Sequence, residues 1–202
     1  VEVGYIGILP LILALAAIFL RRDALTKFFA VLTLISLALA LGGYSILHGW
    51  LNLVPGFSQV RAPARFILLM DFALAALAAL GLESLMHPLS RSARRAFARL
   101  RAGLRWAWLF AAFLLAPVLF VGMVTYQDRD PVLFARAANA VSGGVLFVMF
   151  FGLSLALVYL RGQLRTRLWG ALCVALIFFD LASLGANVDV GESDPTQNFN
   201  HP

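Results

Sequence analysis

The sequence predicts an all-α protein, a polytopic integral membrane bundle of about six transmembrane helices. Of its 202 residues, 62% are hydrophobic and only 13% are charged, whereas a soluble domain is roughly 45–50% apolar. The mean hydropathy is +0.90. Apolar runs long enough to cross a hydrocarbon core of about 30 Å recur along the whole chain. These runs leave no room for a sizeable soluble domain.

Six apolar runs define the expected spans, and tryptophans and tyrosines stand at their ends or in the short links. This placement is typical of membrane interfaces, where an aromatic ring can keep a polar edge in water. We expect residues 1–187 to form the bundle, as a fragment of a larger module, and residues 188–202 to begin a truncated polar external segment. The expected spans are Tyr5–Leu20, Phe28–Ile46, Arg65–Leu85, Trp106–Tyr126, Ala138–Leu160 and Leu168–Leu184.

The distribution of basic residues predicts the orientation. The links after the first, third and fifth runs carry three, six and three basic residues, which is twelve of the sixteen in the chain. Because cytoplasmic links are enriched in Lys and Arg, these three links should be cytoplasmic and both ends of the chain external. The net charge of +6 is therefore mainly a sign of topology. A soluble basic surface for nucleic acid is not expected.

Arg61 and Arg65 flank Pro63 at the expected outer start of the third span. Proline suits the first turn of a helix, where its missing N–H would have no partner. Cations are disfavoured at a helix N-terminus, so the two arginines fit best if an anion such as phosphate lies among them. The alternative is that both side chains extend to lipid headgroups at the interface.

Asp71 and Asp180 are carboxylates within expected spans, where an acidic residue costs about 2.5–3.5 kcal/mol on insertion scales. Asp71 lies about 9 Å from the outer end of its span, and Asp180 lies at a similar depth, about 6 Å, in the same leaflet. We expect both to line one outward cavity with Arg61 and Arg65. The alternative is that each carboxylate bonds a neighbouring helix and locks the bundle.

Four other features of the sequence give further expectations. Asp128-Arg129-Asp130 resembles an acidic metal motif, but Asp130-Pro131 is better explained as the N-cap and first residue of a short external helix. The run Arg91–Arg105 has the pattern of an amphipathic helix lying on anionic lipid. Small residues around Gly81 should allow close helix approach. Cys173 should pack inside its span, and no cofactor or metal site is expected.

Several segments resemble the bacterial YfhO-like membrane proteins, which belong to the GT-C glycosyltransferases. The resemblance rests on GYIGILPLILALAAI, on VPGFSQVRAPARF continuing to LAALGLESL, and on FFDLASLGANVD before the polar tail. The PGF-x-x-x-R-x-P-A-R loop is its most specific part. This resemblance implies a bacterial plasma-membrane enzyme that transfers a sugar from a polyprenyl-phosphate carrier to a cell-envelope acceptor at the outer face.

The same resemblance implies that Arg61 and Arg65 match a phosphate-recognition loop. GT-C enzymes carry their catalytic acidic residue in the first external loop, which has no counterpart here, so the chain resembles the later part of the transmembrane module. Two alternatives stay open. The chain could be a transporter or flippase for a lipid-linked anion, or a non-catalytic subunit of a membrane assembly.

Overall fold

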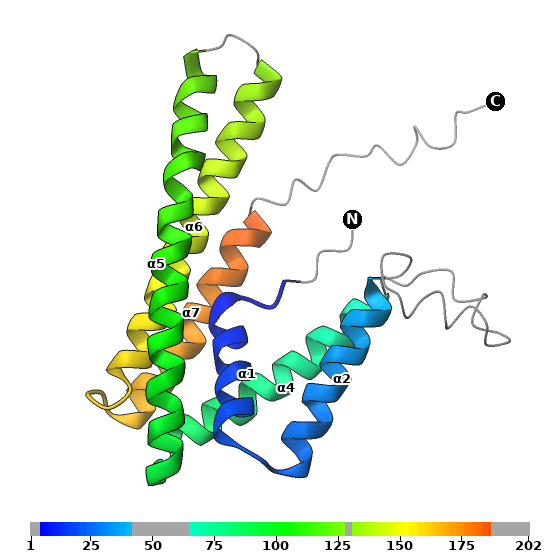
Figure 1. The fold of residues 1–202 in the computed structure, drawn as a ribbon, viewed down its shortest axis with the longest axis vertical. Helices are drawn as coiled ribbons and strands as arrows, with labels where there is room; N and C mark the ends of the chain where they lie inside the picture. The colour runs from blue at the N-terminus through cyan, green and yellow to red at the C-terminus, as the bar shows by residue number, and fades with distance from the viewer. Residues whose placement is uncertain (1–4, 42–64, 128–130, 187–202) are drawn as a thin grey trace, which may run out of the picture.

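The computed structural model describes residues 5–41, 65–127 and 131–186, and every regular element in these ranges is a helix (Figure 1). The predicted all-α class is therefore confirmed. The helices are α1 (Ile8–Leu20), α2 (Ala24–Ala40), α4 (Phe66–Met86), α5 (Arg91–Gln127), α6 (Pro131–Leu160) and α7 (Thr166–Ala186).

Four of these helices, α4, α5, α6 and α7, are long and apolar enough to cross a membrane. Helix α1 has 13 residues and α2 has 17, which corresponds to about 20 and 26 Å at 1.5 Å per residue. The prediction of six complete spans is thus supported for four helices only. Large apolar side chains such as Phe110, Phe113 and Phe120 on α5 are well exposed, as expected for contact with lipid.

The three basic links gather at one end of the bundle, at the bottom of Figure 1. Arg21, after α1, forms an ion pair with Glu83 near the end of α4 at 2.6 Å. Arg161, after α6, donates to the carbonyl oxygens of Leu85 and His87 at 2.5 and 2.7 Å. These contacts join the ends of three helices. The helices alternate in direction, as the sequence predicted (Figure 1). That the basic end lies on the cytoplasmic side of the membrane stays a prediction.

Helix α1 is the central element of the bundle. Leu9, Leu13 and Ala17 are almost fully buried, and α1 packs most closely on α4. A Cβ atom added to Gly81 of α4 would overlap the carbonyl oxygen of Leu13. Only glycine permits this approach of two helix backbones, so the expected role of Gly81 is confirmed.

Helix α5 corrects the prediction of a separate surface helix over Arg91–Arg105. That run continues without a break into the apolar segment, and α5 has 37 residues. Phe97 and Leu104 of the amphipathic part are buried in the protein core. Nothing between Arg105 and Trp106 interrupts the helix, and its apolar stripe is covered by protein and not by a lipid surface.

Two further expectations change at the ends of α6. Pro131 is the first residue of α6, as predicted, but the helix runs unbroken to Leu160, so there is no separate external helix before the span. Trp169, which we expected at an interface, is only 1% exposed. Its indole N–H donates to the carbonyl oxygen of Leu157 at 2.8 Å. The short link between α6 and α7 folds this ring back into the core.

Candidate functional site

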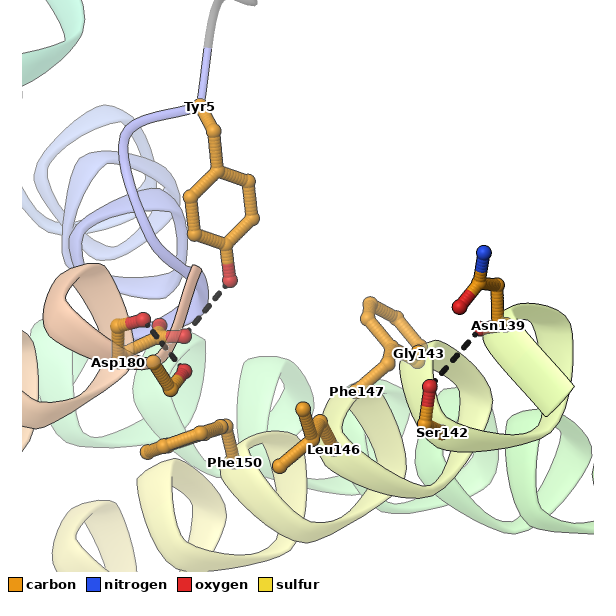
Figure 2. A pocket seen from close by; sticks show the side chains of 9 residues that line it. Tyr5, Asn139, Ser142, Gly143, Leu146, Phe147, Phe150 and Asp180 are labelled. Carbon is orange, nitrogen blue, oxygen red and sulfur yellow. Dashed lines mark hydrogen bonds between the residues drawn. The ribbon is translucent and has the colours of Figure 1, made fainter. Parts of the chain in front are cut away.

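A pocket of about 440 Å³ lies between α6, α7 and the segment before α1. Figure 2 shows Tyr5 and Asp180 on one side of an open space, with Asn139 and Ser142 on the other. The pocket is towards the end of the bundle opposite the basic links, because it adjoins the start of α1 and the last turns of α7. Its lining consists of Tyr5, Asn139, Ser142, Gly143, Leu146, Phe147, Phe150, Asp180 and Ser183.

Asp180 is the N-terminal cap of α1, although 172 residues separate it from Ile8. The backbone N–H of Ile8 donates to Asp180 Oδ2 at 2.8 Å, and the hydroxyl of Tyr5 donates to Asp180 Oδ1 at 2.7 Å. Asp180 is 2% exposed. A carboxylate at this position satisfies a free N–H and opposes the partial positive charge of the helix start. This geometry supports the helix-locking alternative for Asp180.

Gly7 makes the contact between α1 and α7 possible. It precedes α1 with φ 94° and ψ 155°, and it provides no side-chain cap. Residues with a Cβ rarely adopt such a conformation. An added Cβ would also lie 3.1 Å from Asp180 Oδ2. The N-terminal cap of α1 is therefore provided by a carboxylate of α7.

The opposite wall of the pocket belongs to α6. Ser142 donates its hydroxyl to the carbonyl oxygen of Asn139 at 3.1 Å, and both residues are exposed to the pocket side of the helix (Figure 2). Phe147 and Phe150 follow one and two turns further along. The pocket thus combines amide and hydroxyl groups with aromatic rings. Such a lining suits a ligand that has both hydrogen-bonding groups and apolar faces.

Of the described residues that the sequence predicted to share one cavity, Asp180 lines this pocket, whereas Asp71 and Arg65 are not among its lining residues. A cavity common to Asp71, Asp180, Arg61 and Arg65 stays a prediction. Asp71 lies near the start of α4, and within the described residues its buried Oδ1 atom has no hydrogen-bond partner. Arg65 is exposed at the N-terminal boundary of α4, whose first turn has no acidic residue. Arg61 and Pro63 lie outside the described residues.

The sequence pattern does not mark Tyr5, Asn139 or Ser142 as site residues. A tyrosine at a span end is typical of membrane interfaces, and Asn139 and Ser142 are two uncharged polar residues in a long apolar run. Polar residues inside a span favour interior or cavity positions. That rule selects Asn139 and Ser142, because both lie inside the fifth expected span, Ala138–Leu160.

Comparison with known proteins gives no family model that matches the chain, and no curated protein or solved structure is significantly similar to it.

Proposed function

We propose that this chain is part of a membrane glycosyltransferase that uses a polyprenyl-phosphate-linked sugar to modify a cell-envelope acceptor. In this proposal the pocket between Tyr5, Asp180 and Asn139 receives a polar portion of a substrate. Arg65, together with Arg61, binds the phosphate of the donor. The catalytic acid lies outside these 202 residues, in agreement with the sequence resemblance.

The observation that supports this function best is the mixed polar and aromatic pocket at the end of the bundle opposite the basic links. Its volume of about 440 Å³ lies within the usual range of about 300–1,000 Å³ for small-molecule sites. Hydroxyl and amide groups can bond the hydroxyls of a sugar, and Phe147 and Phe150 offer apolar faces. A chain that only anchored a partner in the membrane would not require such a pocket.

The geometry gives Asp180 a structural role within this function. Both of its carboxylate oxygens already accept a hydrogen bond, from Tyr5 and from Ile8. A general base must reach the proton that it abstracts, and the Asp180 side chain is only 2% exposed. We therefore assign Asp180 to holding the shape of the pocket and assign no catalytic residue in this chain.

The pocket is tested by changing the polarity of its wall on α6. Asn139→Leu replaces the amide by an apolar side chain of similar shape, so sugar transfer in membranes containing the complete enzyme, with its catalytic part, should fall by about tenfold, since misplaced substrates react slowly. Transfer is measured with radiolabelled polyprenyl-phosphate-hexose donors. Ala138→Leu adds the same side chain one residue away, at an exposed position that does not line the pocket, and should leave transfer unchanged. If the Asn139→Leu variant transferred sugar as fast as the unchanged protein, the role of the pocket would be refuted.

Phosphate recognition is tested at Arg65. Arg65→Ala should weaken donor binding by about tenfold, because charge-assisted hydrogen bonds to phosphate are lost. Arg65→Lys should restore binding only in part, since lysine lacks the planar fork of arginine. Arg136→Ala is the matched control, because Arg136 is an exposed arginine towards the same end of the bundle. Equal losses in Arg65→Ala and Arg136→Ala would instead favour general contact with lipid headgroups.

A further inference from the structure

Two arginines approach the same aromatic ring at the basic end of the bundle. The Cζ atom of Arg101 on α5 lies 5.2 Å from the centroid of the Phe97 ring, and that of Arg161 lies 5.8 Å from it. The Cζ atom of Arg101 is also 5.1 Å from the ring of Tyr159 on α6. Phe97 is buried, and both arginines are only partly exposed. Two like charges are thus held close together where water is limited.

No acidic side chain in the described part of the chain compensates these two charges. Asp23 and Glu83 are the described acids near this end, and both pair with Arg21, at 3.3 and 2.6 Å. Burial lowers the pKa of Arg161, and the neighbouring charge of Arg101 lowers it further. The arrangement is electrostatically unfavourable unless an anion joins it.

Arg101 also has an unused hydrogen-bond donor. Its Nε atom is buried and has no acceptor among the described residues. Arg161 differs, because its Nε and Nη2 atoms bond carbonyl oxygens at the end of α4. A buried donor without an acceptor lowers stability, and an anionic oxygen would satisfy it.

An apolar groove begins beside these arginines. It has a volume of about 320 Å³ and is lined by Trp108, Gly152, Leu155, Ala156 and Tyr159. Tyr159 is also the ring that Arg101 covers. Arg101 and Trp108 are seven residues apart on α5, which places them about 10 Å apart on one face. The cationic site and the groove therefore meet at Tyr159.

We propose that an anionic phospholipid binds here, with its phosphate between Arg101 and Arg161 and one acyl chain in the groove of Trp108 and Gly152. Guanidinium groups bind phosphate oxygens in pairs, which suits two arginines around one ring. Basic pockets at the cytoplasmic ends of transmembrane helices bind such headgroups. A free phosphate would use the arginines but leave the groove unused. The site is at the opposite end from the pocket of Tyr5 and does not depend on the proposed enzymatic activity.

The proposal is tested with the purified chain in detergent by native mass spectrometry, comparing phosphatidylglycerol and phosphatidylcholine that have identical acyl chains. The unchanged protein should retain phosphatidylglycerol in preference to phosphatidylcholine. Arg101→Gln should reduce this retention by about tenfold, as expected for loss of a charged hydrogen-bonding partner. Arg99→Gln removes the same charge from an exposed position on the same helix and should leave retention unchanged.

A second variant tests the groove. Leucine at position 152 would fill the space against Trp108, because even a Cβ on Gly152 would lie 3.1 Å from Trp108 Nε1. Gly152→Leu should therefore lower retention of both lipids, and glycerol 3-phosphate should not displace phosphatidylglycerol. Equal losses in Arg101→Gln and Arg99→Gln would overturn the proposal in favour of diffuse attraction. Unchanged retention by Gly152→Leu, or displacement by glycerol 3-phosphate, would show a phosphate site without a lipid groove.

Discussion

Polar groups of individual side chains bond the backbones of other helices in this protein. The indole N–H of Trp108 donates to the carbonyl oxygen of Val148 at 3.0 Å, and that of Trp169 donates to Leu157 at 2.8 Å. Arg161 bonds the last carbonyls of α4 in the same way. Because the hydrocarbon core provides no water, each buried donor needs an acceptor within the protein. Such bonds hold helix pairs together where apolar contacts alone would allow sliding.

The cap of α1 gives the first prediction at the scale of single residues. Asp180→Ala should lower the free energy of unfolding by about 1–3 kcal/mol, because the N–H of Ile8 and the hydroxyl of Tyr5 lose their acceptor. Tyr5→Phe removes only one of the two bonds and should have a smaller effect. Thermal unfolding of both variants in detergent measures the difference. A larger loss for Tyr5→Phe than for Asp180→Ala would contradict the capping role.

A second prediction concerns Asp23, in the link between α1 and α2. The hydroxyl of Thr26, which donates to Asp23 Oδ1 at 2.5 Å, and the guanidinium of Arg21 both lower the pKa of Asp23. Since the folded-state pKa is below the unfolded value of about 3.9, the stabilising contribution is present above that pH. It is lost as the pH falls through the folded-state pKa.

Replacing Thr26 by valine should raise the pKa of Asp23 towards its ordinary value, because the hydrogen bond from Thr26 is the largest cause of the lowered pKa. Carboxyl-carbon NMR titration measures this pKa directly. Thr33→Val is the control, because the hydroxyl of Thr33 bonds the carbonyl oxygen of Phe29 instead. An unchanged pKa in Thr26→Val would show that Arg21 alone determines the shift.

At the scale of elements, the contact of α1 with α4 depends on small residues. Ala14 and Ala17 of α1 and Leu77 of α4 form one buried cluster, and Gly81 lies where the two backbones are closest. Without a strong hydrophobic force between helices in lipid, close packing is the main source of their association. The short helix α1 is therefore held by its neighbours and not by its own length.

Gly81→Ala should separate α1 from α4 and destabilise the protein by about 1–3 kcal/mol, as overpacking does in close-packed interiors. Gly103→Ala is the matched control, because a Cβ on Gly103 of α5 would meet no atom within 4 Å. That change should be neutral or stabilise the helix by up to about 1 kcal/mol. Unfolding temperatures in one detergent compare the two variants, and equal temperatures would argue against a close backbone contact.

At the scale of the whole molecule, charge is divided between the two ends of the bundle. Twelve of the sixteen basic residues lie in the links after α1, α4 and α6 or in the starts of the helices that follow them, and these segments lie together at one end, while the pocket of Tyr5 and Asp180 lies towards the other end. This division suits a protein that contacts anionic lipid on one side of the membrane and a polar substrate on the other.

The orientation is testable with single cysteines in a Cys173→Ala background. A cysteine at Ala135, near the start of α6, should react with a membrane-impermeant maleimide in intact cells. A cysteine at Ser92, in the basic region at the start of α5, should react only after the membrane is opened, because positively charged links stay in the cytoplasm. Both positions are exposed. Labelling of Ser92→Cys alone in intact cells would reverse the assigned orientation.

The sequence by itself determined the helical membrane class, the approximate position of each helix and the gathering of the basic links at one end. These are local properties, because hydropathy and charge along a run of about 20 residues decide whether it can lie in a bilayer. Gly81 also belongs to this group, since small residues within a span predict a close helix contact.

Only the tertiary structure decided how the helices complete one another. Asp180 caps α1 across 172 residues and accepts a hydrogen bond from Tyr5 across 175 residues, so no local sequence pattern predicts either contact. Asp71 does not share that pocket, α5 continues through its basic segment, and Trp169 turns into the core. Each outcome depends on which segments the fold brings together, and a buried donor such as the N–H of Ile8 bonds the acceptor that the fold places beside it, wherever that acceptor lies in the sequence.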